Sequence, residues 1–254
     1  MGYYDLSASE RKKLYEQIEK DIADDLSSGN VKNIKRYASD TDGYIRKNCY
    51  LIFGQLYKSN LKIRENILNI LDLLSTSKDE KERQTAVYSL GEIGKIDFDA
   101  AAKRLELFLH DTHHSVKNGL TGAIKQMGDK NPKPVFDWVK IKIKRCDPEI
   151  QKRILHGLEL RGRTHPEDLL PIINEIAYKS MDKKLKKMVI HIIGQISYKK
   201  GCLEKVTNEL KSWKDKTLVA ECEKEIVSVH SRYEKFSALS SEKAARYLAE
   251  NLRS

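Results

Sequence analysis

The hydrophobic and polar residues of this chain follow one pattern that returns six times. Each copy opens with a polar, usually acidic residue, and the position three residues later is apolar in five of the six copies. The opening residues, spaced by 37, 34, 34, 35 and 33 residues, are Asp42, Asp79, His113, Asp147, Asp182 and Asp215. Intervals of this length are typical of repeats that are each built from a pair of helices.

Each copy continues with an apolar stripe. In the second copy Ala86 and Leu90 lie seven and eleven positions after the opening Asp79, and the other five copies have apolar residues at the same two places. Positions three, seven and eleven share one face of an α-helix, so the pattern predicts an amphipathic helix that starts at every opening residue.

A second set of helices is expected in the segments between these copies. Pro132 and Pro166 suit the first turn of a helix, because a helix leaves its first N–H groups unbonded. The expected first helices of the six hairpins are residues 31–38, 61–74, 98–109, 132–144, 166–177 and 203–213.

The two ends of the chain each carry one more helix. Ser7 and Glu10 have the spacing of a capping box, which predicts a helix from there to about residue 26, and residues 242–252 have an amphipathic pattern. We therefore expect an all-α solenoid of about six helical hairpins in a single domain over residues 1–254. Residues 1–30 and 231–254 would cap the repeats at 31–230, because the terminal repeats of a solenoid need covering.

The pattern at residues 79–94 resembles the HEAT repeat, in which Asp, two spacers, an apolar residue and Arg precede an apolar stripe and a Leu-Gly-Glu-Ile-Gly ending. Glu82 stands at the apolar position here, and the resemblance extends over residues 31–230. It implies that the second helix of each hairpin lines the concave face of an armadillo-like solenoid, and that the cation after the apolar residue pairs with a neighbouring repeat.

Positive charge adds a functional expectation. The chain has 47 cations against 37 anions, a net charge of +10, and residues 140–187 hold 13 cations against 7 anions. A positive surface of this kind attracts a polyanion. The cations that open the second helices are the candidate phosphate contacts: Arg46, Lys47, Arg83, Lys117, Lys152, Arg153, Lys186 and Lys187.

Two interpretations of these cations remain open. Arg46, Arg83, Lys117 and Lys186 occupy the position that suits a structural pairing, whereas Lys47, Lys152 and Lys187 come one residue later and are freer to contact phosphate.

Aromatic and histidine side chains on the same helices extend the candidate site. Tyr50, Tyr57 and Tyr88 either pack in the core or line a groove in which bases stack. His156 and His191 are equivalent residues of successive repeats, and they either contact phosphate or bases or are partly buried without a ligand.

Segments 131–138 and 147–153 resemble bacterial HEAT-like DNA alkylation-repair proteins. That resemblance implies a duplex DNA partner, and it implies DNA glycosylase activity only if a cleft holds suitable aromatic and acidic residues. Glu92 and Glu159 are acidic candidates without a distinguishing motif, so no catalytic residue is assigned and enzymatic activity stays open. The alternative function is a non-catalytic scaffold for protein–protein interaction that binds an acidic protein segment.

No metal and no cofactor is expected. The four cysteines lack zinc-ligand spacing, residues 110–114 fall in a turn where polar capping residues belong, and no phosphate-binding glycine loop occurs. His156 and His191 would share a metal only if their side chains converged. No leader or membrane-spanning run is recognised, so we expect a cytoplasmic protein with no membrane partner and no small-molecule cofactor.

Overall fold

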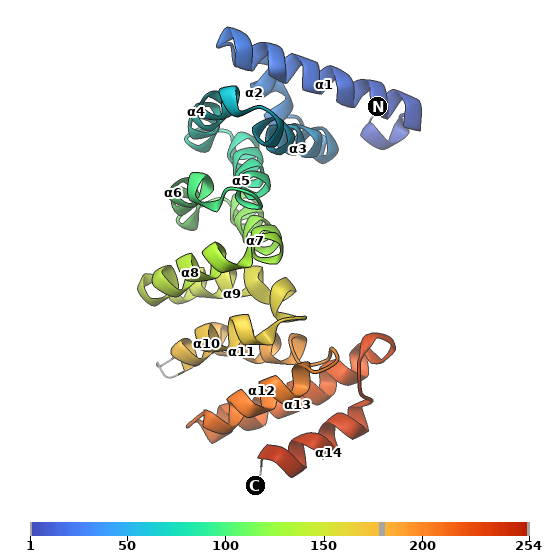
Figure 1. Ribbon diagram of the computed structural model, residues 1–254, viewed down its shortest axis with the longest axis vertical. Helices are drawn as coiled ribbons and strands as arrows, with labels where there is room; N and C mark the ends of the chain where they lie inside the picture. The colour runs from blue at the N-terminus through green and yellow to red at the C-terminus, as the bar shows by residue number, and fades with distance from the viewer. Residues whose placement is uncertain (1, 178–180, 253–254) are drawn as a thin grey trace. The chain divides into compact units, whose positions relative to one another are not determined.

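The computed structural model describes residues 2–177 and 181–252 (Figure 1). Within these ranges the chain forms fourteen α-helices and four short 3-10 helices, and it contains no β-strand. The predicted all-α solenoid of paired helices is confirmed.

Six hairpins follow one another along the described chain. Each joins a first helix to a second helix that begins at one of the recurring polar residues. The pairs are α2 (Lys32–Ala38) with α3 (Gly43–Ser59), α4 (Arg64–Ser75) with α5 (Glu80–Gly94), α6 (Phe98–Leu109) with α7 (His114–Lys130), α8 (Pro132–Lys142) with α9 (Pro148–Gly162), α10 (Pro166–Ala177) with α11 (Lys183–Gln195), and α12 (Cys202–Ser212) with α13 (Lys216–Arg232).

The recurring polar residue is the N-cap of every second helix. Its side chain accepts a hydrogen bond from a backbone N–H of the first turn at Asp42, Asp79, His113, Asp147, Asp182 and Asp215. This bond satisfies one of the N–H groups that a helix start leaves unpaired, which explains why a short polar side chain recurs at this position.

Helices also cover both ends of the described chain. α1 (Ala8–Ser28) starts with the predicted capping box, in which Glu10 N–H donates to Ser7 Oγ and Ser7 N–H donates to Glu10 Oε2. It stops at Gly29, whose φ of 74° lies in the left-handed region that favours glycine. α14 (Ser241–Leu252) matches the predicted final helix within one residue.

The first helices depart from prediction at their ends. The segment predicted as 61–74 starts with the 3-10 helix η2 (Leu61–Ile63) before α4, and the segment predicted as 132–144 finishes in the 3-10 helix η3 (Ile143–Arg145). The remaining 3-10 helices are η1 (Tyr3–Asp5) and η4 (Glu234–Phe236). Apolar residues continue into both 3-10 helices, η2 and η3, so the spacing of apolar residues does not show where α-helical hydrogen bonding starts or stops.

The chain divides into two compact units, Met1–Asn131 and Pro132–Ser254, each containing three hairpins. In the first unit α5 packs between α3 and α7, and in the second α11 packs between α9 and α13. A single continuous solenoid over residues 1–254 stays a prediction.

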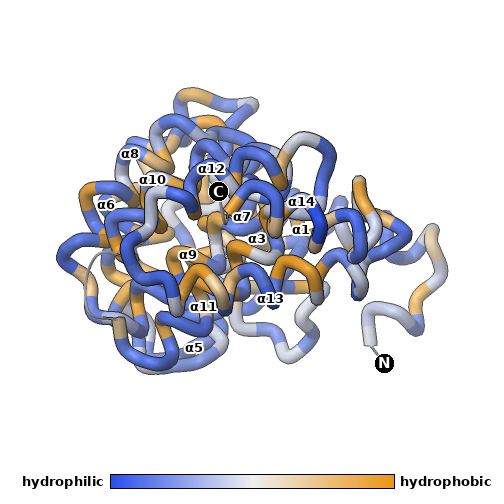
Figure 2. The backbone as a smooth tube through the Cα atoms, turned by 90° about the horizontal axis from the view of Figure 1, so that it is seen from below, coloured by the Kyte–Doolittle hydropathy of each residue, from blue (hydrophilic) through white to orange (hydrophobic). Residues whose placement is uncertain are grey.

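The apolar stripe forms the core of each unit. Hydrophilic and hydrophobic residues alternate along the helices (Figure 2), and the stripe residues are at most 1% exposed. These residues are Cys49, Phe53, Ala86, Leu90, Leu120, Ile124, Ile154, Leu158, Val189, Ile193, Cys222 and Ile226.

Small residues allow the second helices to approach closely. A Cβ placed on Gly91 of α5 would lie 2.9 Å from Ala123 Cβ of α7, closer than two carbons pack.

Candidate functional site

Three of the predicted phosphate-contacting cations, Arg46, Arg83 and Lys186, form hydrogen bonds or ion pairs within the protein. Arg83 Nε donates to Asp111 Oδ2 at 2.7 Å and its Nη1 donates to the Ser77 carbonyl at 2.8 Å, which ties α5 to the turn before α7. Arg46 donates to the carbonyls of Asp40 and Thr41.

Lys186 Nζ lies 2.9 Å from Glu221 Oε1, which joins α11 to α13, and the hydrogen bond to Glu221 raises the pKa of Lys186. These contacts match the structural interpretation for Arg46, Arg83 and Lys186, but not for Lys117.

Two further predicted cations share one carboxylate. Lys152 Nζ and Arg153 Nη2 lie 2.7 and 2.8 Å from the two oxygens of Glu149, within the first turns of α9. Their side chains are only 27% and 20% exposed, and Glu149 offsets part of their charge. Both are therefore less available to a phosphate than the sequence suggests.

Lys47 and Lys187 are exposed, and neither forms an ion pair with a residue that the structure describes. Lys117 on α7 is half-buried and likewise has no ion-pair partner in the described chain.

Lys187 belongs to a larger group that the sequence analysis did not single out. Exposed lysines surround the N-termini of the neighbouring helices α11 and α13, and none of them pairs with a carboxylate of the described residues. We call this group the lysine patch: Lys183, Lys184, Lys187, Lys214 and Lys216. Its signal in the sequence is the run of lysines that follows the N-cap Asp182 and the pair that flanks the N-cap Asp215.

Net charge is distributed very unequally between the two units. Residues 1–131 contain 21 cations and 20 anions, a net charge of +1. Residues 132–254 contain 26 cations and 17 anions, a net charge of +9. Most of the net positive charge therefore lies in the second unit, which carries the lysine patch.

Two of the candidate aromatic residues meet in the first unit. The rings of Tyr50 on α3 and Tyr88 on α5 stack with their centroids 5.0 Å apart and 26° between their planes. Together with Arg46 and Lys47 they line a cavity of about 310 Å³. Burial raises the pKa of Tyr50 to about 12.

Tyr57 lies elsewhere. Tyr57 is 2% exposed and its hydroxyl donates to Asp97 Oδ2 at 2.7 Å, so it packs in the core and is not part of the stacked pair.

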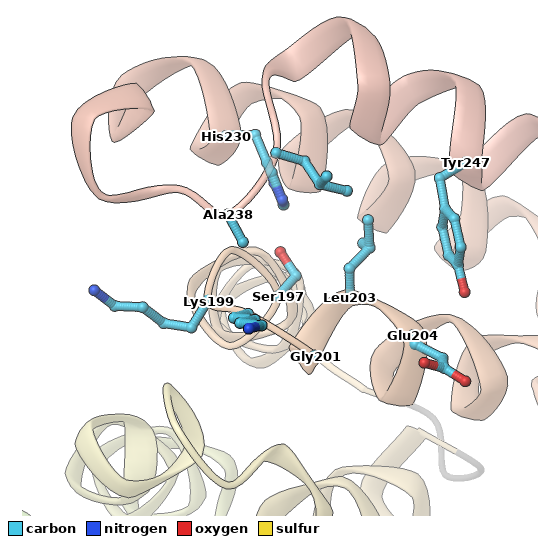
Figure 3. Close-up of a pocket in the computed structure, with 10 residues that line it drawn as sticks. Ser197, Lys199, Gly201, Leu203, Glu204, His230, Ala238 and Tyr247 are labelled. Atoms are coloured by element: carbon cyan, nitrogen blue, oxygen red, sulfur yellow. The ribbon is translucent and has the colours of Figure 1, made fainter.

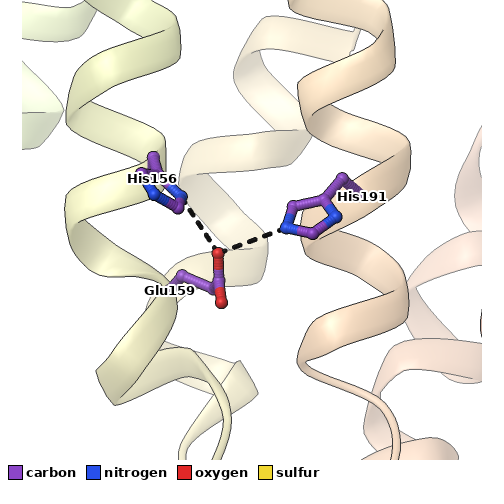
Figure 4. Close-up of side chains that lie close together, drawn as sticks. All are labelled: His156, Glu159 and His191. Atoms are coloured by element: carbon purple, nitrogen blue, oxygen red, sulfur yellow. Dashed lines mark hydrogen bonds and ion pairs between the residues drawn. The ribbon is translucent and has the colours of Figure 1, made fainter. Parts of the chain in front are cut away.

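His156 and His191 converge on one carboxylate (Figure 4). His156 Nδ1 lies 3.1 Å from Oε2 of Glu159, one turn further along α9, and His191 Nε2 on α11 lies 3.5 Å from the same oxygen. Burial alone raises the pKa of Glu159, but the hydrogen bonds from both histidines and the charge of Arg163 hold the pKa far below its ordinary value. The carboxylate is therefore ionised, and the convergence that the sequence left open is present.

The histidine-rich turn at residues 110–114 has a structural role. His113 caps α7, and Asp111 pairs with Arg83 and accepts a bond from the His113 N–H. Glu92, the other acidic candidate, pairs with Lys95 at 2.7 Å.

A cavity of about 510 Å³ lies beside α12, α13 and α14 in the second unit (Figure 3). His230 of α13 and Tyr247 of α14 extend toward it, opposite Ser197 and Leu203. Burial lowers the pKa of His230, so its imidazole is neutral at pH 7, and the ring bonds the Ile226 carbonyl at 2.9 Å.

Among the described residues, no helix combines the length and apolar character that crossing a bilayer requires.

No protein-family model matches the chain, and no curated protein matches it by sequence. One similar solved structure is an engineered protein that is 14% identical, covers 79% of this chain and 98% of its own, and has a TM-score of 0.36. Another engineered protein is 16% identical, with 98% and 76% covered and a TM-score of 0.38. A designed armadillo repeat protein solved with a (KR)4 peptide is 14% identical, with 86% and 90% covered and a TM-score of 0.31. These similarities are too low to bear on function.

Proposed function

We propose that this chain is a helical-repeat binding protein that grips the phosphate backbone of duplex DNA through its second unit. The lysine patch at the starts of α11 and α13 carries the proposal. Lys187, predicted from the sequence, is retained in the contact surface, while Lys152, Arg153 and Lys186 are secondary because carboxylates already neutralise them.

The position of the patch supports an anionic ligand. The N-terminus of a helix carries a partial positive charge, so a nearby cation is unfavourable by about 0.3–1 kcal/mol when no anion is present. The N-caps Asp182 and Asp215 offset only part of the charge of five exposed lysines. A phosphate at this place interacts favourably with the lysines and the helix starts together.

The form of the patch suits duplex DNA. Four of the lysines lie on the neighbouring helices α11 and α13, and Lys214 directly precedes the N-cap of α13. Packed helices are about 8–10 Å apart. Duplex DNA carries about one negative charge per 1.7 Å of helix axis, so several lysines can neutralise phosphates without a precise register.

An acidic protein segment is the second candidate, and the charges of α13 favour it. Beyond Lys216 in its first turn, α13 carries Glu221, Glu223 and Glu225. The phosphates of a duplex that extends along α13 would be repelled by these glutamates. A short acidic segment can instead contact the lysines without reaching the glutamates.

The test is fluorescence anisotropy of the full chain with a labelled duplex of about 20 base pairs over a range of salt concentrations. If four lysines each neutralise one phosphate, the logarithm of the binding constant falls by about 3–4 per tenfold increase in salt. Lys183→Glu with Lys187→Glu is expected to abolish binding. The matched control, Lys235→Glu with Lys243→Glu, makes the same change in net charge at exposed sites outside the patch.

Competition separates the two partners. An acidic peptide that binds the patch in the absence of any duplex binding would overturn the DNA proposal and support the scaffold function. Excision of an alkylated base, which the resemblance to alkylation-repair proteins implies, is tested on the same duplex carrying one alkylated purine.

A further inference from the structure

His156, Glu159 and His191 bring two imidazoles and one carboxylate together on α9 and α11. One ligand atom from each residue lies within 4.8 Å of the other two. Two imidazoles and a carboxylate are a donor set that binds zinc and similar divalent transition metals. We propose that these three residues form a binding site for one such ion, a property separate from DNA binding.

The spacing of the donor atoms fits the proposal. Zinc holds nitrogen and oxygen ligands at about 2.0–2.2 Å, so tetrahedral ligand atoms lie about 3.3–3.6 Å apart. The two histidine nitrogens lie 3.1 and 3.5 Å from Glu159 Oε2, close to that separation. The ion would replace the hydrogen bonds between these nitrogens and Oε2, so both nitrogens must be unprotonated when it binds.

A second layer of contacts orients the carboxylate. Arg163 Nη2 donates to Glu159 Oε1 at 2.5 Å and to Gln195 Oε1 at 2.9 Å. This arrangement leaves Oε2 directed at the two histidines, as hydrogen-bonded carboxylate ligands are in metal sites. The charge of Arg163 opposes a cation, so we expect weaker binding than at a site without the arginine.

Exposure makes the site accessible. The side chain of Glu159 is 3% exposed, while those of His156 and His191 are 48% and 40% exposed. An ion can therefore enter from solvent and keep a water molecule in its remaining position, as zinc sites with three protein ligands do.

Bound metal would also connect two hairpins. His156 and Glu159 belong to the α8/α9 hairpin and His191 belongs to the α10/α11 hairpin. The ion bridges them at the level of the second helices, so binding raises the melting temperature of the second unit.

The test is calorimetric titration of zinc chloride into chelator-treated full-length chain that carries no polyhistidine tag. We expect one ion per chain, and we expect His156→Ala and His191→Ala each to weaken binding at least about tenfold. His165→Ala removes a histidine of the same unit outside the cluster and serves as the matched control. Both target histidines hydrogen-bond the buried Glu159 carboxylate, so each variant is expected to melt below the wild type in chelator. Metal binding is therefore read from the rise in melting temperature that zinc causes in each chain.

Cobalt(II) is a second probe. Ligation by nitrogen and oxygen gives visible d–d absorption without a thiolate charge-transfer band. Failure to bind zinc, unchanged binding in both histidine variants, or a thiolate band pointing to cysteine would each overturn the proposal. Failure to bind zinc would mean that Glu159 acts only as an ion-pair partner of Arg163 and the histidines.

Discussion

The contact between Arg83 and Asp111 is expected to be a main stabilising link of the first unit. Arg83→Met keeps most of the apolar stem but removes the donors at 2.7 Å and 3.3 Å to Asp111 and at 2.8 Å to the Ser77 carbonyl. The side chains of Arg83 and Asp111 are only 16% and 9% exposed, so water compensates little for the lost bonds.

The expected magnitude lies between two limits. Loss of one hydrogen bond to a charged group costs about 1.5–3 kcal/mol, and removal of one partner from a fully buried ion pair costs about 3–5 kcal/mol. Asp111 keeps the bond from the His113 N–H at 2.8 Å, which limits the penalty. We expect Arg83→Met to lower the free energy of unfolding by about 2–4 kcal/mol.

The effect also depends on pH. Burial alone raises the pKa of Asp111, but the hydrogen bonds from Arg83 and the His113 N–H hold the pKa below its ordinary value of 3.8. A lowered carboxyl pKa contributes stability above the unfolded-state pKa, and this stability is lost as pH falls through the folded value. The deficit of Arg83→Met should therefore shrink as the pH of the unfolding measurement falls from 7 to below the ordinary carboxyl value of 3.8.

The assay is urea unfolding of the wild type, Arg83→Met, Asp111→Asn and the double variant. Both tryptophans of the chain lie in residues 132–254, so their fluorescence follows the second unit while far-UV circular dichroism follows both. We expect a shift in the dichroism transition and a coupling energy of at least about 1 kcal/mol.

Lys81→Met is the matched control on the same helix. Its ion pairs are 3.5 and 4.0 Å long and its side chain is 35% exposed, so we expect a change within about 0.5 kcal/mol. An Arg83→Met chain as stable as this control, or a coupling energy near zero, would refute the reasoning.

Two further predictions concern packing. Gly91→Val places side-chain atoms against Ala123, and this overpacking should lower the free energy of unfolding by about 1–3 kcal/mol in the same urea assay. An unchanged transition midpoint would contradict the close packing of α5 and α7. Cys49 is buried, and burial raises the pKa of its thiol. At neutral pH iodoacetamide should therefore modify the half-exposed Cys146 first and Cys49 only after unfolding, as read by mass spectrometry. Equal modification rates of the two cysteines in the native chain would contradict the buried position of Cys49.

The helices were predictable because their signals are local. The N-cap Asp79 and the stripe residues Ala86 and Leu90 lie within a few turns of one another on one helix. The same pattern recurs in the other repeats, so each copy supports the helix predicted from the others. Helix ends were less predictable, because η2 and η3 keep the apolar pattern while changing the hydrogen bonding.

The site was predictable only in part, because a repeat gives the register of a residue and not its partner. The sequence analysis missed the pairing of Lys152 with Glu149, although an i,i+3 spacing on one helix allows it. The pairing of Lys186 with Glu221 joins residues 35 positions apart, which the repeat alone does not predict. The convergence of His156 and His191 depends on side-chain rotamers, which periodicity does not report.

The central claim is that the lysine patch binds duplex phosphate, and the salt-dependent anisotropy titration with its two double variants tests it most directly. The account predicts binding that weakens steeply with salt, disappears in Lys183→Glu/Lys187→Glu and persists in Lys235→Glu/Lys243→Glu. Absence of binding at low salt, or equal loss in both double variants, would contradict it.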